Sequence, residues 1–321
     1  MRPDTLTDNK IMKATREGFG EGLLQIGNDE RVYGLCADLT ESVQMHHFAK
    51  AYANRYIEMG IAEQNMAAVA SGIASMGMIP YMASYAAFNP GRNWEQIRTT
   101  IAYNNVPVRI IGAHAGLSVG PDGGSHQMLE DIALMRVMPN MTVLVPIDAN
   151  EARAMTMASL NMKGPVYIRL TREKSPLILS DDYVYNSEPQ IIYKTPTNKI
   201  KKLAIITCGP IAYQAIKSIA EIEKHNIELL IVNLSTIKPL DEKFMLNLIK
   251  SYSHILTVEE HQIYGGLGSL VAEFVVRHGH VKMDMVAVKD RFGQSGKTEE
   301  LYKEYEISSE YIIDRAVTLV F

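Results

Sequence analysis

Short apolar runs alternate with helix-like segments along almost the whole chain, and this alternation restricts the fold more than any other feature of the sequence. In the first half, five runs are strand-like: RVYGLCADL (31–39), MIPYMASYA (78–86), VPVRIIGAHAG (106–116), MTVLVPIDA (141–149) and GPVYIRL (164–170). The stretch after the fourth run, residues 149–162, is typical of the helix-like segments between them. Strands that alternate with helices favour a largely parallel sheet covered by helices, so we predict an α/β fold.

The pattern lapses once and then resumes, which divides the chain in two. Residues 180–202 are polar and contain prolines at 189 and 196, and we interpret them as a linker that could form a hairpin. A second α/β series begins at residue 203 and ends in a helix-like segment, 307–321. The sequence therefore predicts two α/β domains, residues 1–185 and 190–321, each with a largely parallel sheet flanked by helices.

Composition narrows the classes of function. The 321 residues carry a formal net charge of −4 and no Lys/Arg-rich stripe, which argues against nucleic-acid binding. No window reaches the ~18 uninterrupted apolar residues of a membrane span, and residues 1–19 lack the apolar core of a secretory signal. Cys36 and Cys208 lie far apart, without the spacing of zinc ligands, which indicates a reducing compartment. We expect a soluble, cytoplasmic protein.

A glycine-rich loop, residues 112–127, follows the third apolar run. It contains five glycines together with His114, Asp122 and His126. In an open α/β sheet, ligands bind beyond the carboxyl ends of the strands, and two imidazoles with a carboxylate suit proton transfer to hydroxyl or carbonyl groups. An ordinary surface loop explains the same composition equally well.

Glu63 stands at the start of a predicted helix, in the segment GIAEQNM (60–66). Apolar residues at 62, 66, 69, 73 and 76 form one face of that helix. Glu63 begins the neighbouring stripe, whose other members, Ala67, Ala70 and Ala74, are small enough to let another backbone come close. On local grounds, a carboxylate at a helix start is already explained by the helix macrodipole.

Another group of polar residues lies near the start of the chain. Arg16 falls in a helix-like stretch, and Asp38, Thr40 and Ser42 follow the first strand-like run. A solvated arginine and a helix cap are the simpler explanation of these residues when they are taken alone.

Two arginines, Arg169 and Arg172, close the fifth apolar run. A guanidinium group at the end of a strand could hold a phosphate through two parallel hydrogen bonds. The alternative is an ion pair with Glu173, the next residue along the chain.

In their order and spacing, these segments resemble the transketolase family of thiamine diphosphate enzymes. The motifs that carry the resemblance are ATR, ADLT-x-S, GIAEQNM, SYAAF, H-x7-DG-x2-HQ, MPNMTVLVPIDANE, YIRLTR, IKPLD, VEEHQIYGGLGS and RFGQSG. They match the pyrimidine-binding and C-terminal domains of that family. The resemblance implies that a partner subunit supplies the diphosphate-binding domain with its GDG…N motif for Mg²⁺. Asp122 and Asn150 have a similar spacing, but Pro121 and an intervening strand pattern make it a coincidence, and we expect no metal site in this chain.

The resemblance assigns the cofactor contacts. The matching positions are Asp38, Leu39, Glu63, Tyr85 and Phe88. Glu63 would contact the aminopyrimidine ring of thiamine diphosphate and promote its activation, and the aromatic rings would pack around it. Asp38 and Leu39 would lie beside the thiazolium ring. The third aromatic residue of the family has no equivalent, because Gly91 and Arg92 stand near its place.

The resemblance also assigns the substrate contacts. The matching positions are Arg16, Ser42, His114, Asp122, His126 and Arg172. The two histidines would assist proton transfers as catalytic residues, and Arg16, Ser42 and Arg172 would bind the substrate phosphate. Glu41 replaces a residue that is often proline, which would alter the phosphate end of the site. For His261, in the C-terminal half, we expect a structural role.

The function implied is that of the C-terminal subunit of a two-subunit transketolase. It would move a two-carbon ketol unit from a ketose phosphate to an aldose phosphate, within an α₂β₂ heterotetramer that contains an N-terminal partner subunit. Three alternatives share the fold: a deoxyxylulose phosphate synthase, a β subunit of a 2-oxo-acid dehydrogenase, and a non-catalytic scaffold. His114 and Arg16 together favour the transketolase, and the presence of Glu63, Asp122 and His126 argues against a scaffold.

Overall fold

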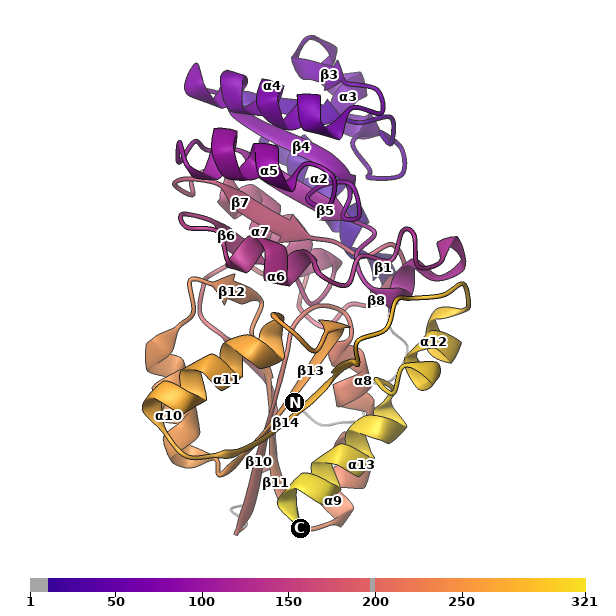
Figure 1. Cartoon of the computed structure of the whole chain (residues 1–321), viewed down its shortest axis with the longest axis vertical. Coiled ribbons are helices and arrows are strands. Elements are labelled where there is room, and N and C mark those ends of the chain that lie inside the picture. The colour runs from indigo at the N-terminus through magenta and orange to yellow at the C-terminus, as the bar shows by residue number, and fades with distance from the viewer. Residues whose placement is uncertain (1–10, 197–199) are drawn as a thin grey trace.

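The computed structural model describes residues 11–196 and 200–321, which form two α/β bodies stacked along the long axis of the molecule (Figure 1). Residues 1–10, part of the polar start of the chain, and residues 197–199 of the predicted linker lie outside the described residues. The predicted α/β class with two helix-flanked, largely parallel sheets is confirmed. Within the described ranges, none of the helices is long and apolar enough to cross a membrane.

A seven-stranded sheet forms the first body, in the order β12-β6-β7-β5-β4-β2-β3. Its strands are β2 (Val32–Cys36), β3 (Tyr56–Glu58), β4 (Ile79–Tyr85), β5 (Arg109–Ala113), β6 (Thr142–Leu144), β7 (Val166–Arg169) and β12 (Thr236–Lys238). Neighbouring strands run parallel except β12, which pairs antiparallel with β6. The helical segments of this half are α2 (Thr15–Ile26), α3 (His46–Ala51), η1 (Ala53–Arg55), α4 (Glu63–Ser75), α5 (Trp94–Gln96), η2 (Ile97–Ala102), η3 (Leu117–Asp122), α6 (Asp131–Arg136) and α7 (Ala149–Ser159). Two short strands, β1 (Met12–Ala14) and β8 (Lys174–Pro176), pair with each other.

A five-stranded sheet forms the second body, in the order β14-β13-β10-β11-β9. Its strands are β9 (Gln190–Lys194), β10 (Lys201–Thr207), β11 (Ile227–Asn233), β13 (His254–Gln262) and β14 (Lys282–Val288). All pairs are parallel except that of β9 with β11. The helices are α8 (Ala212–Lys217), α9 (Ile219–Lys224), α10 (Glu242–Ser251), α11 (Leu267–His278), α12 (Thr298–Glu304) and α13 (Ser309–Val320).

The continuous apolar runs in the sequence are the central strands of these sheets. Every residue of β5 and β11 is buried, as expected for strands covered by helices on both faces. One hydrophobic cluster contains residues of both sheets, among them Met82 from the first and Ile206 and Val232 from the second. The two bodies therefore share part of their core.

The prediction of a hairpin within residues 180–202 is wrong. The strand in this segment, β9, pairs antiparallel with β11 and forms an edge of the second sheet. The chain crosses between the bodies again at β12, a segment of the second half that extends the first sheet. The division of the chain at residues 185–190 stays a prediction.

Helix α4 buries its small stripe together with Met66, while Val69 and Ile73 are only partly buried. Ala67 and Ala70 are completely buried, whereas Met76, just beyond the helix, is 78% exposed. Next to the small stripe, α4 packs closely against η2. A hydrogen bond joins the two helices, in which Ser71 Oγ donates to the carbonyl oxygen of Thr100 at 2.7 Å. This packing fixes the start of α4, where Glu63 lies.

Candidate functional site

The predicted site residues follow the carboxyl ends of adjacent parallel strands. Asp38 comes after β2, Tyr85 ends β4, His114 follows β5 and Arg172 comes shortly after β7. These strands are neighbours in the order β7-β5-β4-β2, so their carboxyl ends share one edge of the sheet. This edge is where an α/β sheet offers loops to a ligand.

Two aromatic and two imidazole rings form the centre of the candidate site. The rings of Tyr85 and His114 stack with their centroids 3.8 Å apart and their planes at 23°. Phe88 lies 6.1 Å from Tyr85, and His126 meets the two aromatic rings edge-on at 6.0 and 5.5 Å. The structure thus brings together four residues that the sequence separates by up to 41 positions, from Tyr85 to His126.

His114 is held as a neutral imidazole. It is 1% exposed and has a φ of 55°, a backbone conformation that few non-glycine residues adopt. Burial, followed by the positive charges of Arg16 and Arg172, lowers its pKa to about 3. Its Nδ1 atom is buried without a hydrogen-bond partner among the described residues. A buried, unpaired ring nitrogen at the end of a strand is a group available to a ligand.

Arg16 and Arg172 place positive charge beside His114. Arg16 Nη1 donates to the carbonyl oxygen of Ser42 at 2.8 Å and lies 3.5 Å from His114 Nε2. Arg172 Nη1 donates to the carbonyl oxygen of Val119 at 2.8 Å. Burial and the neighbouring Arg172 lower the pKa of Arg16, as expected for two guanidinium groups that face the same space. Two converging cations of this kind suit an anion such as a phosphate.

Arg172 is not simply the partner of Glu173, and Arg169 does not belong to the site. Arg172 Nη1 lies 3.7 Å from a carboxylate oxygen of Glu173 and 3.9 Å from one of Asp122, which are loose contacts on a partly exposed side chain. Arg169, in contrast, is buried between the two bodies. Its Nε donates to Asp131 Oδ2 at 2.9 Å and its Nη2 donates to the carbonyl oxygen of Glu260 at 2.8 Å.

Glu63 is a buried carboxylate with two side-chain partners. It is 2% exposed. Arg92 Nη1 donates to its Oε2 at 2.8 Å, and Ser84 Oγ donates to its Oε1 at 3.4 Å. The side-chain amide of Asn93 donates to its backbone carbonyl at 3.1 Å, which holds the first turn of α4 in place. Sequence reasoning assigned no contact to Arg92, because 29 residues separate it from Glu63.

Glu58 is a second acidic residue near the site that the sequence did not indicate. Its carboxylate accepts hydrogen bonds from the backbone N–H groups of Asp38 and Gly60 at 2.8 and 2.9 Å and from Thr40 Oγ1 at 2.9 Å. Burial opposes the charged form of Glu58, but these donors outweigh burial and lower its pKa. Glu58 therefore fixes the turn in which Asp38 has a φ of 57°.

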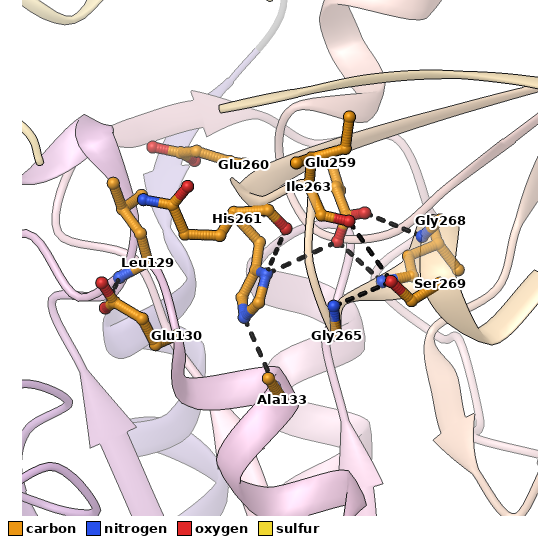
Figure 2. Close-up of polar contacts among 12 residues, drawn as sticks. Leu129, Glu130, Ala133, Glu259, Glu260, His261, Ile263, Gly265, Gly268 and Ser269 are labelled. Atoms are coloured by element: carbon orange, nitrogen blue, oxygen red, sulfur yellow. Dashed lines mark hydrogen bonds and ion pairs between the residues drawn. The ribbon is translucent and has the colours of Figure 1, made fainter. Parts of the chain in front are cut away.

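His261 makes no ring contact with these residues and lies at the junction of the two bodies, where Figure 2 shows it directed toward Ala133. Burial lowers its pKa to about 4. Its Nδ1 lies 2.8 Å from the carbonyl oxygen of Gln262, and its Nε2 accepts a hydrogen bond from the backbone N–H of Ala133 at 3.3 Å. Figure 2 also shows Glu259 directed toward the start of α11, where it accepts from the N–H of Gly268 at 2.7 Å. These contacts join β13 to α6 and α11.

The geometry fits the aminopyrimidine half of thiamine diphosphate. Such a ring needs a carboxylate for its ring nitrogen and apolar faces beside it. Glu63 and Phe88 offer these two features close together, because the Arg92 guanidinium contacts both: Nη1 donates to Glu63, and Cζ lies 4.6 Å from the centroid of the Phe88 ring. Within residues 11–196 and 200–321, no three His, Cys, Asp or Glu side chains are close enough together to hold a metal ion. Asn150, which the spacing with Asp122 had singled out, donates to the carbonyl oxygen of Leu179 instead.

The chain matches two family descriptions in succession. Residues 12–176 match the transketolase pyrimidine-binding domain, and residues 196–312 match the transketolase C-terminal domain. A transketolase C-terminal section of Methanocaldococcus jannaschii is 38% identical over 95% of this chain and 96% of its own length. An apulose-4-phosphate transketolase subunit of Actinobacillus succinogenes is 32% identical over 88% of this chain and 90% of its own length.

A solved structure agrees with the sequence relatives. A split-gene transketolase, solved as an inactive β4 tetramer, superposes with a TM-score of 0.84 at 34% identity, over 96% of this chain and 99% of that one. The fold, the order of the two domains and these relatives lead to one conclusion: the chain belongs to the transketolase family and contains that family's pyrimidine-binding and C-terminal domains.

Proposed function

We propose that this chain is one subunit of a thiamine diphosphate-dependent transketolase, which transfers a two-carbon ketol unit from a ketose phosphate to an aldose phosphate. The observation that carries the proposal is the combination found at one sheet edge. A buried carboxylate lies beside aromatic rings, a neutral histidine stacks on one of those rings, and two arginines converge on that histidine.

Each group has a task in this reaction. Thiamine diphosphate, when bound, supplies the carbon nucleophile and the electron sink that carbon–carbon bond cleavage requires. Glu63 holds a proton at the ring nitrogen of the aminopyrimidine, and Tyr85 and Phe88 orient that ring. Asp38 and Leu39 line the thiazolium side.

The remaining residues act on the sugar. His114, neutral at working pH, and His126 exchange protons with substrate hydroxyl and carbonyl groups, and Asp122 accepts hydrogen bonds from hydroxyls. Arg16 and Arg172, with Ser42, bind the phosphate group at the far end of the sugar. Charge pairing with two arginines favours a phosphorylated sugar over a neutral one.

The activity of this chain depends on a partner that contributes the diphosphate-binding domain and its Mg²⁺. The relatives support this part of the proposal, because one is named for a C-terminal section and another is a split-gene protein whose β4 tetramer is described as inactive. Two copies of this chain and two of the partner would form an α₂β₂ heterotetramer. Light scattering on the co-expressed pair measures that stoichiometry.

The experiment is to co-express the chain with a partner subunit that contains the diphosphate-binding domain and to assay ketol transfer from xylulose 5-phosphate to ribose 5-phosphate. We expect activity only in the pair, and Glu63→Ala should lower kcat at least about 100-fold, the scale of a lost proton-transfer group. Glu95→Ala is the matched control, since Glu95 is an exposed carboxylate on α5. Cofactor binding without transfer from any ketose phosphate would contradict the proposal and favour a 2-oxo-acid substrate.

A further inference from the structure

Glu63 and Arg92 form an unequal ion pair. The Glu63 side chain is 2% exposed, whereas that of Arg92 is 46% exposed. A buried carboxylate is costly without a charged or hydrogen-bonding partner, and among the described residues Arg92 provides the short charged contact, 2.8 Å from Nη1 to Oε2. The arginine reaches the carboxylate from the solvent side, so it can leave without unfolding the helix.

The backbone explains why an arginine and not an aromatic ring reaches this place. Position 91 cannot carry a side chain, because a Cβ atom on Gly91 would collide with the carbonyl oxygen of Ala87. The next residue, Arg92, is anchored by its N–H, which donates to the carbonyl oxygen of Phe88 at 3.1 Å. Its guanidinium then lies over the Phe88 ring, 4.6 Å from Cζ to the centroid. Arg92 therefore occupies the space near which the family has its third aromatic residue.

The guanidinium group resembles the ligand that this space is proposed to receive. It is planar and cationic, it donates N–H groups to a carboxylate, and it stacks on an aromatic face. A protonated aminopyrimidine is likewise planar and cationic, and it presents a ring N–H to a carboxylate. Arg92 makes two of the contacts that the proposed function assigns to that ring, one to Glu63 and one to Phe88. A ring that used Oε2 of Glu63 and the same face of Phe88 would compete with the guanidinium for both contacts.

We infer that Arg92 is an internal stand-in for the cofactor's aminopyrimidine: it keeps Glu63 paired in the cofactor-free subunit and is displaced when thiamine diphosphate binds. The inference rests on the proposed function. Arg92 then tunes cofactor affinity. When the guanidinium occupies a larger fraction of the sites, fewer sites can bind the cofactor and the apparent dissociation constant increases.

The test compares thiamine diphosphate affinity in the reconstituted pair, by isothermal titration calorimetry at saturating Mg²⁺, for the wild type, Arg92→Met and Arg92→Lys. We expect Arg92→Met to bind the cofactor about 10-fold more tightly. This is the gain if the guanidinium occupies the site in roughly nine of ten wild-type molecules. Arg92→Lys keeps the charge but not the planar face, so its gain should be smaller. Arg98→Met is the matched control, since Arg98 is an exposed arginine of η2 and its removal should leave the affinity unchanged.

A second measurement links the effect to the ion pair. In a Glu63→Gln background the gain from Arg92→Met should vanish, because the carboxylate for which the two groups compete is gone. The isolated Arg92→Met subunit should also melt at a lower temperature than the wild type, since its buried carboxylate has lost its partner.

The possible outcomes separate the inference from the proposed function. If the wild-type pair bound no thiamine diphosphate, the proposed function would fail and the inference with it. If the wild-type pair bound the cofactor but Arg92→Met and Arg92→Lys bound it equally well or more weakly, the function would stand and the stand-in role would be overturned. If Arg92→Met did not fold, the comparison of Arg92→Lys with the wild type would decide the question in the same way.

Discussion

His114 shows how its surroundings determine the form in which a proposed catalytic side chain acts. Its pKa is lowered to about 3 by burial and then by Arg16, Arg172 and His126, so the imidazole is neutral at every pH at which the enzyme is expected to work. A neutral histidine can accept one hydrogen bond and donate another, but its own titration cannot shape the pH dependence of the reaction between pH 5 and pH 9.

We therefore predict that His114→Asn lowers kcat/KM for ketol transfer about 100-fold, because a hydrogen-bonding group for the substrate is misplaced. The acidic limb of the pH–rate profile should stay where it is in the wild type. The measurement is kcat/KM from pH 5 to pH 9 for both proteins in the reconstituted pair. An acidic limb that moved or disappeared in the variant would mean that His114 titrates in that range, contrary to its burial among cations.

At the scale of the elements, β12 ties the second half of the chain to the first sheet by pairing with β6, and Lys238 in this strand adds side-chain contacts. Lys238 Nζ donates to the carbonyl oxygen of Arg136 at 3.0 Å and also to that of Met138, at the end of α6. At the C-terminal end of a helix, the last carbonyl groups have no N–H partner within the helix, and Lys238 supplies one here. Burial, followed by the charge of Arg136, lowers the pKa of Lys238, but the two acceptors keep the amine in place.

Lys238→Met keeps the length of the side chain and removes the donor, so we predict a loss of about 1–3 kcal/mol in the free energy of unfolding, the cost of partly buried carbonyls without partners. Urea denaturation of the isolated subunit measures this loss. Lys243→Met, which replaces an exposed lysine on α10, should have little effect. Equal midpoints for the two variants would show that water replaces the lysine without cost.

The elements also show what the sequence can and cannot indicate. The strand ends that gather Asp38, Tyr85 and His114 were predictable, because parallel strands with helices between them bring their carboxyl ends to one edge. The path of β12 was not predictable: no sequence signal in residues 227–239 marks a change of sheet, yet the chain leaves the second sheet after Asn233 and joins the first at Thr236. Antiparallel edge strands are chosen by partners far away in the sequence, and no local pattern encodes them.

The same limit applies to the site. The resemblance pointed to Glu63, but its partner Arg92 was noted only as the place where an aromatic residue was missing. The contact depends on how α4 packs against the segment that follows β4, and this is a tertiary property. Glu58 was missed for a similar reason, since it lies on a three-residue edge strand and its importance comes from the backbone N–H groups that converge on it.

At the scale of the whole molecule, Glu151 joins the two bodies from the first turn of α7. It is completely buried, and its carboxylate accepts hydrogen bonds from Ser235 Oγ at 2.7 Å, Asn233 Nδ2 at 3.1 Å and Gln190 Nε2 at 3.1 Å, all from the second half of the chain. The backbone N–H of Ile147 donates to it at 2.6 Å. Burial nevertheless raises its pKa to about 7, because these dipoles only partly replace water around the charge.

The raised pKa of Glu151 predicts how the stability of the junction changes with pH. The folded protein keeps this proton to about pH 7, while the unfolded chain releases it near the ordinary pKa of 4.5, so the contribution of Glu151 to stability is present below pH 4.5 and is lost as the pH rises to 7. Glu151→Gln cannot titrate, so the stability of the wild type relative to this variant should fall by up to ~3 kcal/mol between pH 4.5 and pH 8. Glu30→Gln replaces an exposed carboxylate on the first body and is the control: its free energy of unfolding should change with pH in the same way as that of the wild type. The measurement is the free energy of unfolding of the three proteins by urea across that range. If the difference between wild type and Glu151→Gln stayed constant with pH, the carboxylate would be ionised throughout, and the donors from Ser235 and Asn233 would outweigh the burial that raises its pKa.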